Sequence, residues 1–509
     1  MNTEGALNYD AWVAMLPPSD PQREDILNGI RHGFKITTED YKGPYIWENN
    51  YKSATDPARR HAVEQQILEE LANGRYIMAS SRPRIISALG AIDKPNSNKV
   101  RLIHDCSRPP GYALNDLATP EKFSYQSVQD AVALVKENCY LAKIDLSNAY
   151  RSVKIHPTDH QVTGLAWTFE GEDTPSIMYD TRLPFGARLS PQKFNNLTQA
   201  VCRIMASKGV IRMVAYLDDF LIISPSKEEC QQQMQLLIKT LRHLGFAINY
   251  SKVTGPCQQL TFLGVEFNTI SCTLGLPADK LSTFLTDVKQ MYSKRTASKR
   301  ELQSLAGRLS WASQVVIGGR PHLRRVLDLI NRLSKPSHRT RITGDMKEDL
   351  SWWICYAAQF NGTLPMIDHR QYSFVCIDAC PVAAGAYFNG QCLYHPWKDW
   401  PGSEDLHINY KEVLTVVSAA LLWCKQWANK IVKVHCDNQA AVAIINKGTA
   451  KDPFVMSSLR NLFWLSALFN FKLSAVYYPG SYNTIADACS RLHEPGGWDK
   501  LAVALQFCY

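Results

Sequence analysis

Long hydrophobic runs are missing from this 509-residue sequence. Its larger apolar stretches, such as residues 413–423, are too short and too closely flanked by polar residues to span a bilayer. Residues 1–16 lack a basic region followed by an apolar core, which excludes a recognisable secretory signal. The sequence therefore predicts an intracellular protein, cytoplasmic or nuclear, that is not secreted and has no membrane partner.

Paired cysteine motifs are missing as well, as are internal repeats and low-complexity segments. The 14 cysteines are scattered without a repeated Cys-x-x-Cys spacing, so we expect reduced thiols rather than a disulfide framework. With 45% hydrophobic and 20% charged residues, the composition is that of a globular protein of several domains, roughly three to four at this length.

Acidic residues are scarce in one region. Between Lys294 and Arg341 only Glu301 and Asp328 oppose twelve basic residues, so this stretch carries a net charge of +10, whereas the whole chain carries +9. An excess of this size can release counterions from a phosphate backbone, which favours contact with nucleic acid. A solvated helical face is the alternative interpretation. The basic residues are Lys294, Arg295, Lys299, Arg300, Arg308, Arg320, Arg324, Arg325, Arg332, Lys335, Arg339 and Arg341.

The hydrophobic pattern divides the chain into five segments. Residues 1–75 are expected to form a helical, partly extended lead-in, with a helix over 56–73. Short apolar strands alternate with helices over residues 76–270. A helical segment follows over residues 271–368, and a second α/β pattern over 369–495 leaves a tail at 496–509.

Individual elements follow from the same pattern. We expect strands at 140–146, 211–217, 221–224 and 260–267, and helices at 127–137, 190–206 and 227–244. Ser190 is expected to cap its helix, with Pro191 in the first turn. Residues 336–343 are a predicted linker and 361–370 a predicted loop, with a helix over 345–358 between them. From Gln371 the expected order is strand, strand, strand, helix, strand, helix, helix, strand, helix.

Tyr216-Leu217-Asp218-Asp219 places two adjacent carboxylates on a bend between two apolar runs. Such charges repel each other, and their flanking residues do not neutralise them. A bound divalent metal is the usual reason for such a pair, although Asp218 alone could be a turn residue. With Asp145, at the end of another apolar strand, they form a ligand set for two Mg²⁺ ions, or Mn²⁺ as the alternative, as phosphoryl transfer requires.

The segments around these acids resemble, in order and spacing, the palm motifs of retroelement reverse transcriptases. These segments are Asp145-Leu-Ser-Asn-Ala-Tyr150, Leu183-Pro-Phe-Gly-Ala-Arg-Leu-Ser-Pro191 and Tyr216-Leu-Asp-Asp219. Upstream, Lys94-Pro-Asn-Ser-Asn-Lys-Val-Arg101 followed by Asp105 resembles the fingers motif that grips the incoming triphosphate. Downstream, Leu244-Gly245-Phe246 with Lys252 and then Phe262-Leu-Gly-Val-Glu-Phe267 resemble the last two palm motifs, the second being the primer grip.

The resemblance implies roles for the residues that would meet the incoming nucleotide. Lys94 and Arg101 would neutralise triphosphate charge. Tyr150 would exclude a 2′-hydroxyl, so that the enzyme selects deoxynucleoside triphosphates. Taken singly, the two basic residues would be solvated surface charges and Tyr150 a core aromatic; their place among ordered motifs favours the functional interpretation.

The same resemblance assigns four further substrate-binding positions. Phe185 and Gly186 would line the nucleotide pocket, and Lys252 would belong to the substrate site. Ser190, followed by Pro191, would begin the helix beneath the template.

A second set of acids lies in the C-terminal α/β segment. Asp378 and Asp437 end predicted strands, Glu412 lies in the first turn of a helix, and Asp487 lies in the last helix of the pattern. Four acids from four elements are what a carboxylate site for two cations requires. Taken alone, Glu412 would be an N-terminal acid favoured by the helix dipole.

The order of these four acids resembles a ribonuclease H domain. The local contexts are Ile377-Asp-Ala379, Asn409-Tyr-Lys-Glu412, Asp437-Asn438 and Asn483-Thr-Ile-Ala-Asp-Ala-Cys-Ser-Arg491. Such domains cut the RNA strand of an RNA–DNA hybrid, which they recognise by groove width and 2′-hydroxyls. Many members have a histidine in the loop before the last acid, whereas here the loop reads Pro479-Gly-Ser-Tyr-Asn483. His407 and His435 lie near the acids in sequence, and we expect a structural role for each at least as readily as a catalytic one.

Together the resemblances imply an α+β multidomain fold: a right-hand polymerase with fingers, palm and helical thumb or connection, followed by an α/β ribonuclease H-like domain. Residues 299–311 and 319–325 resemble DIRS-type elements, which integrate through a tyrosine recombinase; Gypsy-like elements are the second interpretation. No Asp-Thr-Gly or Asp-Ser-Gly protease motif is present, and no integrase is expected after the nuclease.

The expected activity is RNA-directed DNA synthesis coupled to RNA-strand cleavage. Its partners would be an RNA template, a DNA primer, the RNA–DNA hybrid and deoxynucleoside triphosphates, with an element-encoded recombinase as a plausible further partner. Two alternatives remain, a catalytically silent nucleic-acid-binding scaffold and a protein in which only the nuclease is active. All seven acids are present, which speaks against the scaffold.

Overall fold

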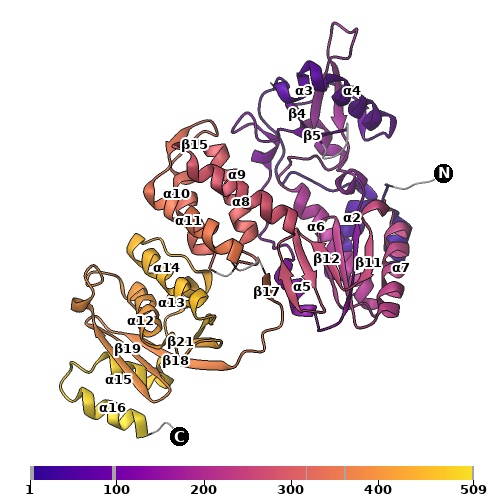
Figure 1. Cartoon of the computed structure of the whole chain (residues 1–509). Coiled ribbons are helices and arrows are strands. Elements are labelled where there is room, and N and C mark those ends of the chain that lie inside the picture. The colour runs from indigo at the N-terminus through magenta and orange to yellow at the C-terminus, as the bar shows by residue number, and fades with distance from the viewer. Residues whose placement is uncertain (1–4, 94–98, 317, 360–362, 507–509) are drawn as a thin grey trace. The chain divides into compact units, whose positions relative to one another are not determined.

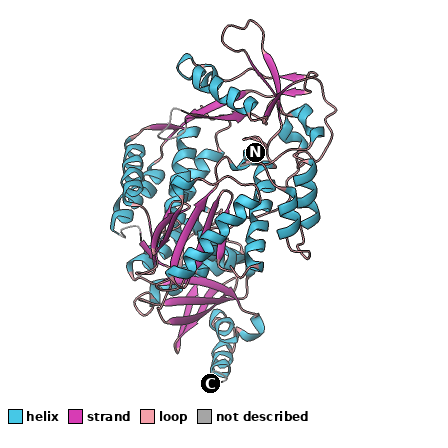
Figure 2. Cartoon of the chain, turned by 90° about the vertical axis from the view of Figure 1, so that its right-hand side faces the viewer, coloured by secondary structure: helices cyan, strands magenta, loops and turns pink. Residues whose placement is uncertain are grey.

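A computed structural model describes residues 5–93, 99–316, 318–359 and 363–506. The chain divides into two compact units (Figure 1). The first contains Met1–Leu263 and Phe267–Ser271, and the second contains Gly264–Glu266 and Cys272–Tyr509. Helices and strands alternate within both units (Figure 2). Among the described residues, no helix has both the length and the hydrophobicity needed to cross a membrane.

The first unit contains α1 to α7 and the first twelve strands, β1 to β12. The helices are α1 (Tyr9–Met15), α2 (Arg23–His32), α3 (Lys52–Thr55), α4 (Pro57–Ala72), α5 (Val128–Leu134), α6 (Ser190–Ser207) and α7 (Lys227–His243). The strands are β1 (Ile46–Trp47), β2 (Tyr76–Met78), β3 (Ile85–Ile86), β4 (Leu89–Asp93), β5 (Val100–His104), β6 (Tyr140–Asp145), β7 (Gly164–Trp167), β8 (Ser176–Asp180), β9 (Met213–Tyr216), β10 (Asp219–Ser224), β11 (Thr254–Cys257) and β12 (Gln259–Phe262). The short 3₁₀ helices are η1 (Leu114–Leu117), η2 (Ala149–Ser152), η3 (Pro157–Val162) and η4 (Tyr250–Lys252).

A four-stranded sheet in the order β11-β6-β10-β9 forms the centre of the first unit. Its strands are apolar along most of their length, and the amphipathic helix α7 packs against β6, β10 and β11 while α6 packs against β9. A five-stranded sheet, β1-β3-β7-β8-β2, and the hairpin β4–β5 complete the unit. The central sheet is rigidly supported, so its strand ends are suited to hold a site.

The N-terminal lead-in belongs to the core of the first unit. Trp12 on α1 is fully buried, donates from Nε1 to the carbonyl of Leu244 at 3.1 Å, and meets the ring of Phe246 edge-on at 6.2 Å. Arg203 on α6 pairs with Asp20. These contacts join sequence positions about 180 to 230 residues apart, which local pattern does not reveal.

The second unit has nine helices, α8 to α16, among its described residues. They are α8 (Ala278–Ser293), α9 (Lys299–Ala312), α10 (Arg324–Asn331), α11 (Gly344–Gln359), α12 (Ile408–Trp423), α13 (Gln439–Lys447), α14 (Pro453–Leu468), α15 (Thr484–Ser490) and α16 (Gly497–Gln506). The strands from the junction onward are β13 (Val265–Asn268), β14 (Thr273–Gly275), β15 (Thr296–Ser298), β16 (Arg339–Arg341), β17 (Thr363–Pro365), β18 (Tyr372–Ala379), β19 (Ala383–Phe388), β20 (Gln391–Pro396), β21 (Ile431–Cys436) and β22 (Lys472–Tyr477). The short helices are η5 (Arg320–Leu323), η6 (Trp397–Asp399) and η7 (Gly480–Tyr482).

The sheet of the second unit has the order β20-β19-β18-β21-β22, with β18, β21 and β22 parallel and β19 and β20 antiparallel. Helix α12 packs on the face to which Val375, Ile377 and Ala384 point. Helix α15 packs on the opposite face. It approaches Gly385 so closely that a Cβ there would lie 2.1 Å from the Ser490 nitrogen. The observed order from β18 to α15 confirms the predicted order of elements after Gln371.

Four local predictions were wrong. The strand expected over 260–267 is two strands, β12 and β13, because Leu263 and Gly264 both adopt positive φ and turn the chain. The linker at 336–343 contains β16, which pairs with β15, and the loop at 361–370 contains β17, which pairs with β14. Ser190 lies inside α6, and Leu189 is the N-cap residue, without a side-chain hydrogen bond.

Candidate active sites

The first three predicted acids meet at one end of the central sheet. Asp219 at the start of β10 lies directly opposite Asp145 at the end of β6 in the antiparallel register, so their side chains leave the sheet on the same side. Asp218 lies in the two-residue turn between β9 and β10, and its carbonyl accepts a hydrogen bond from the Leu146 nitrogen at 3.0 Å. The turn requires a positive φ at Leu217.

Among the described side chains, Lys252 is the only ion-pair partner of these three acids. Burial, and then the adjacent carboxylate of Asp218, raise the pKa of Asp219 to about 6. Burial and Asp145 raise the pKa of Asp218. Asp145 accepts hydrogen bonds from Asn249 Nδ2 at 3.1 Å and from Lys252 Nζ at 3.2 Å. The three side chains offer carboxylate oxygens, the ligands that Mg²⁺ prefers, and a bound cation would relieve the repulsion between the carboxylates.

A cavity of about 880 Å³ opens beside Asp145 and Asp218. Its wall includes three of the predicted nucleotide-binding residues, Arg101, Tyr150 and Phe185, and also Lys252. Asp219 does not belong to the wall. Lys94 lies outside the described residues.

The aromatic part of this wall is an ordered stack. The rings of Tyr150 and Phe185 stack at 5.2 Å with 20° between their planes, and the Arg101 guanidinium lies 5.3 Å from the Phe185 ring centre. Burial raises the pKa of Tyr150, so its hydroxyl stays neutral. A cation, a flat ring and a phenol thus line one cavity beside the acids, a combination suited to phosphate, base and sugar.

Gly186 is fixed by its neighbours. Its φ is 126°, and a Cβ there would lie 2.1 Å from the carbonyl oxygen of His104. Its own carbonyl accepts from Asn115 Nδ2 at 3.0 Å. Ser190, in contrast, is fully buried, and its hydroxyl oxygen has no hydrogen-bond partner. The structure therefore gives Ser190 no route to a ligand except through the position of α6.

Sequence reasoning missed a buried ion network behind the cavity. Arg151 forms two hydrogen bonds to Asp180, at 2.9 and 3.0 Å, and an ion pair with Glu70 at 2.6 Å. His104 lies 3.5 Å from Asp180, and Tyr76 hydrogen-bonds His104 at 3.0 Å. All five residues are buried and line the cavity. The available signal was Arg151 itself, an arginine directly after Tyr150, the last residue of the resembling motif.

The second set of acids surrounds the ends of β18 and β21. Ser490 donates to Asp378 at 2.6 Å, and the Ala379 nitrogen donates to Glu412 at 3.0 Å. Burial and the neighbouring acids raise the pKa of Asp378 to about 6 and that of Glu412 to about 8, and burial also raises the pKa of Asp437. Asp487, on α15, pairs with Arg491 at 2.7 Å. Asp378, Glu412 and Asp437 have no ion-pair partner among the described side chains.

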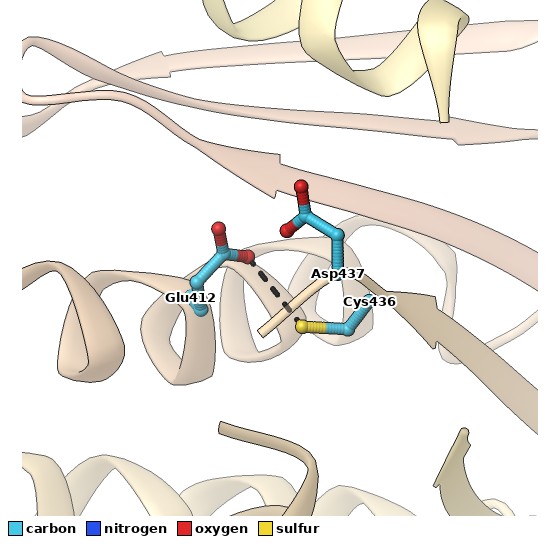
Figure 3. A group of neighbouring side chains, drawn as sticks. All are labelled: Glu412, Cys436 and Asp437. Carbon is cyan, nitrogen blue, oxygen red and sulfur yellow. Dashed lines mark hydrogen bonds between the residues drawn. The ribbon is translucent and has the colours of Figure 1, made fainter. Parts of the chain in front are cut away.

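One cysteine joins this cluster, and no sequence pattern predicted it. Figure 3 shows Glu412 reaching from α12 towards Cys436 and Asp437 at the end of β21, with a hydrogen bond between the thiol and Glu412 at 3.8 Å. Ligand atoms of these three residues lie within 4.8 Å of one another, the only such group of three found in the described part of the chain. The carboxylates therefore approach closely enough to share a cation.

The two nearby histidines have structural contacts. His407 caps α12, since its ring accepts from the Asn409 nitrogen at 3.2 Å. His435 stacks on Tyr478 at 4.6 Å.

The basic stretch is partly neutralised within the second unit. Lys294 pairs with Glu301, Arg324 with Asp328, and Arg308 with Asp287. Six exposed basic side chains of the stretch have no ion pair among the described residues: Arg295, Arg300, Arg320, Arg332, Lys335 and Arg341. They are the charges available to a phosphate backbone.

Residues 79–267 match the family model described as reverse transcriptase (RNA-dependent DNA polymerase). The chain contains a reverse transcriptase domain. This domain covers the first three acids and most of the residues that line the cavity beside them. The match does not extend over the second set of acids.

Relatives extend the similarity along the chain. The Tf2-3 and Tf2-7 transposon polyproteins of Schizosaccharomyces pombe are each 21% identical over 489 residues, covering 92% of this chain. The chain spans about a third of the length of these relatives, 33% in each case. Retrotransposon polyproteins are therefore homologues of this reverse transcriptase-containing chain.

Solved structures show the fold. The foamy viral protease–reverse transcriptase in complex with double-stranded DNA aligns with a TM-score of 0.53 at 18% identity, over 92% of this chain and 96% of that one. The same viral protein in complex with an RNA/DNA hybrid aligns with a TM-score of 0.53 at 18% identity, over 92% of this chain and 62% of that one. The predicted fold, a polymerase followed by a ribonuclease H-like domain, is confirmed.

Proposed function

We propose that the chain is an RNA-directed DNA polymerase with a coupled ribonuclease H. It copies retrotransposon RNA into DNA and degrades the RNA strand of the resulting hybrid. The observation that carries the proposal is the convergence of Asp145, Asp218 and Asp219 at one strand end, beside a cavity walled by Arg101 and the Tyr150–Phe185 stack.

Each of the polymerase residues would contact a different part of the incoming nucleotide. The guanidinium of Arg101 binds triphosphate oxygens, and the Phe185 ring supports the nucleotide. The Tyr150 ring fills the space that a 2′-hydroxyl would occupy. Mg²⁺ ions bound by the three aspartates would activate the attacking hydroxyl and stabilise the leaving oxygen. Lys252, which now faces Asp145, stays close enough to balance negative charge when the triphosphate binds.

The nuclease residues form the second metal-binding set. Glu412 and Asp437 present carboxylates to one another across a short gap, and Asp378 and Asp487 complete the set from β18 and α15. Burial and mutual repulsion raise the pKa values of Asp378, Glu412 and Asp437, and a divalent cation would compensate that buried negative charge. The RNA strand of the hybrid is the proposed substrate.

Primer extension on an RNA template and cleavage of a labelled RNA–DNA hybrid test the two activities separately. We expect Asp218→Asn to lose extension and keep hybrid cleavage, and Asp378→Asn to show the reverse. Asp173→Asn and Asp405→Asn, at exposed loop positions, are the matched controls. Loss of both activities in each variant would refute separable sites. A wild-type protein that binds hybrid but performs neither reaction would favour the catalytically silent scaffold.

The finer assignment to a DIRS-type element also belongs to this proposal. It rests on the resemblance of residues 299–311 and 319–325, which form α9 and η5. A neighbouring tyrosine recombinase gene would support it, and an integrase gene would favour a Gypsy-like element.

A further inference from the structure

An uncovered row of aromatic side chains crosses the sheet of the ribonuclease H-like domain. Along β18, Val375 and Ile377 point into the core, whereas Tyr372 and Phe374 point outwards and are 59% and 57% exposed. Asp378 belongs to the same outward-pointing set. The aromatic residues and this acid therefore lie on one face of one strand.

The rings continue from strand to strand. The Tyr372 and Phe374 rings lie 6.4 Å apart, Phe374 lies 5.5 Å from His435 on β21, and His435 stacks on Tyr478 at 4.6 Å. Tyr478 in turn lies 6.1 Å from Tyr482, which is 70% exposed. We call these five rings the aromatic row.

The row ends beside the acids of the candidate nuclease site. Tyr482 is the last residue of η7, directly before α15, the helix that carries Asp487. Gly480, in the same short turn, lies so close to Asp437 that a Cβ there would be 2.9 Å from Asp437 Oδ2. A chain bound along the row would therefore be led to Asp437 and Asp487.

Two lysines lie near the start of the row. Lys433 Nζ lies 5.8 Å from the centre of the Tyr372 ring, and Lys472 is exposed on the neighbouring strand, paired in register with the start of β21. The other side chains on this face of β21 and β22 are uncharged: Ile431, His435, Ser474 and Val476.

This combination fits single-stranded nucleic acid. Exposed rings stack on bases of any sequence, and lysines at intervals hold the phosphates. A duplex offers no free base faces to such a row, and a basic peptide would be repelled by the lysines.

We propose that the aromatic row binds an unpaired segment of the RNA strand that enters or leaves the nuclease site. The assignment of that site rests on the proposed ribonuclease H function, but the binding itself does not require cleavage. Unpaired RNA next to a hybrid is thereby held on the domain that cuts it.

Fluorescence anisotropy in the presence of a chelator tests the binding without cleavage. The probes are a blunt RNA–DNA hybrid and the same hybrid with a single-stranded RNA overhang. We expect the wild-type chain to prefer the overhang. The double variant Tyr372→Leu, Phe374→Leu should lose at least tenfold in affinity for it, because two rings that stack on bases are removed. Affinity for the blunt hybrid should not change.

Tyr482→Leu, at the other end of the row, gives a second and independent variant. Trp498→Leu is the matched control, because Trp498 is an equally exposed ring, 70% exposed, on α16. Equal overhang affinity in the wild type and both row variants would overturn the inference. A second outcome would also overturn it: the wild type self-associates, and the double variant abolishes this self-association but keeps its affinity for the overhang. The row would then be a protein interface. If the row binds RNA but no hybrid is cut, the proposed nuclease function fails and the inference stands.

Discussion

Replacing Asp180 with asparagine removes one carboxylate from the buried ion network that lines the cavity beside Asp145 and Asp218. Asp180 is fully buried, and its two oxygens accept hydrogen bonds from Arg151 at 2.9 and 3.0 Å and from the Arg182 nitrogen at 2.9 Å. Arg182 is also buried, with two guanidinium nitrogens that have no hydrogen-bond partner. The substitution therefore leaves buried positive charge without its main counterion.

Breaking one side of a buried ion pair destabilises by about 3–5 kcal/mol. The asparagine amide keeps the shape and one acceptor, so we expect a loss near the lower limit, about 3 kcal/mol. Hydrogen exchange of peptides covering β8 and η2, measured against urea concentration, reports this loss within the first unit. Asp93→Asn is the control, because its pair with Arg59 is exposed and contributes about 1 kcal/mol or less.

The same substitution should affect nucleotide choice. Arg151 follows Tyr150 directly and also donates to the Leu183 carbonyl at 3.4 Å, which begins the segment that carries Phe185. Loosening Arg151 should therefore loosen the Tyr150–Phe185 stack. We expect the ratio of kcat/KM for deoxynucleotides over ribonucleotides to fall in Asp180→Asn. The reasoning is refuted if the free energy of unfolding of Asp180→Asn lies within about 1 kcal/mol of that of Asp93→Asn and the kcat/KM ratio is unchanged.

Three further predictions follow from single positions. Gly186→Ala should raise the KM for deoxynucleotides severely, since the new Cβ collides with backbone; Gly171→Ala, with φ of 84° and nothing within 4 Å, isolates the effect of φ alone. Tyr150→Val should admit ribonucleotides, measured as a drop in sugar discrimination of at least tenfold, and unchanged discrimination would contradict the assigned role. Between about pH 4.5 and about pH 8, folded Glu412 keeps a proton that the unfolded chain releases, so the metal-free second unit should lose stability as pH rises. Thermal unfolding at a series of pH values should show this loss. Mg²⁺ should offset the loss, and Glu412→Gln should abolish it.

Local pattern predicted the strands and helices that carry the acids. The apolar run before Asp145 became β6, the run after Asp218 became β10, and the nine-element order after Gln371 was correct. These elements are long and strongly patterned, so burial and backbone geometry agree within each segment. The turn at Leu263–Gly264 was missed because its residues lie inside an apolar run that reads as one strand.

The sequence by itself determined which acids to examine, because the candidate metal-binding acids and their flanking strands lie in contiguous motifs. Only the tertiary structure decided what surrounds them. The Glu70–Arg151–Asp180 network, the Cys436 thiol beside Glu412 and the aromatic row each join residues from separate elements, and such contacts depend on strand register and helix placement. A side chain's partners are set by distance in space, and one sequence without its fold contains no measure of that distance.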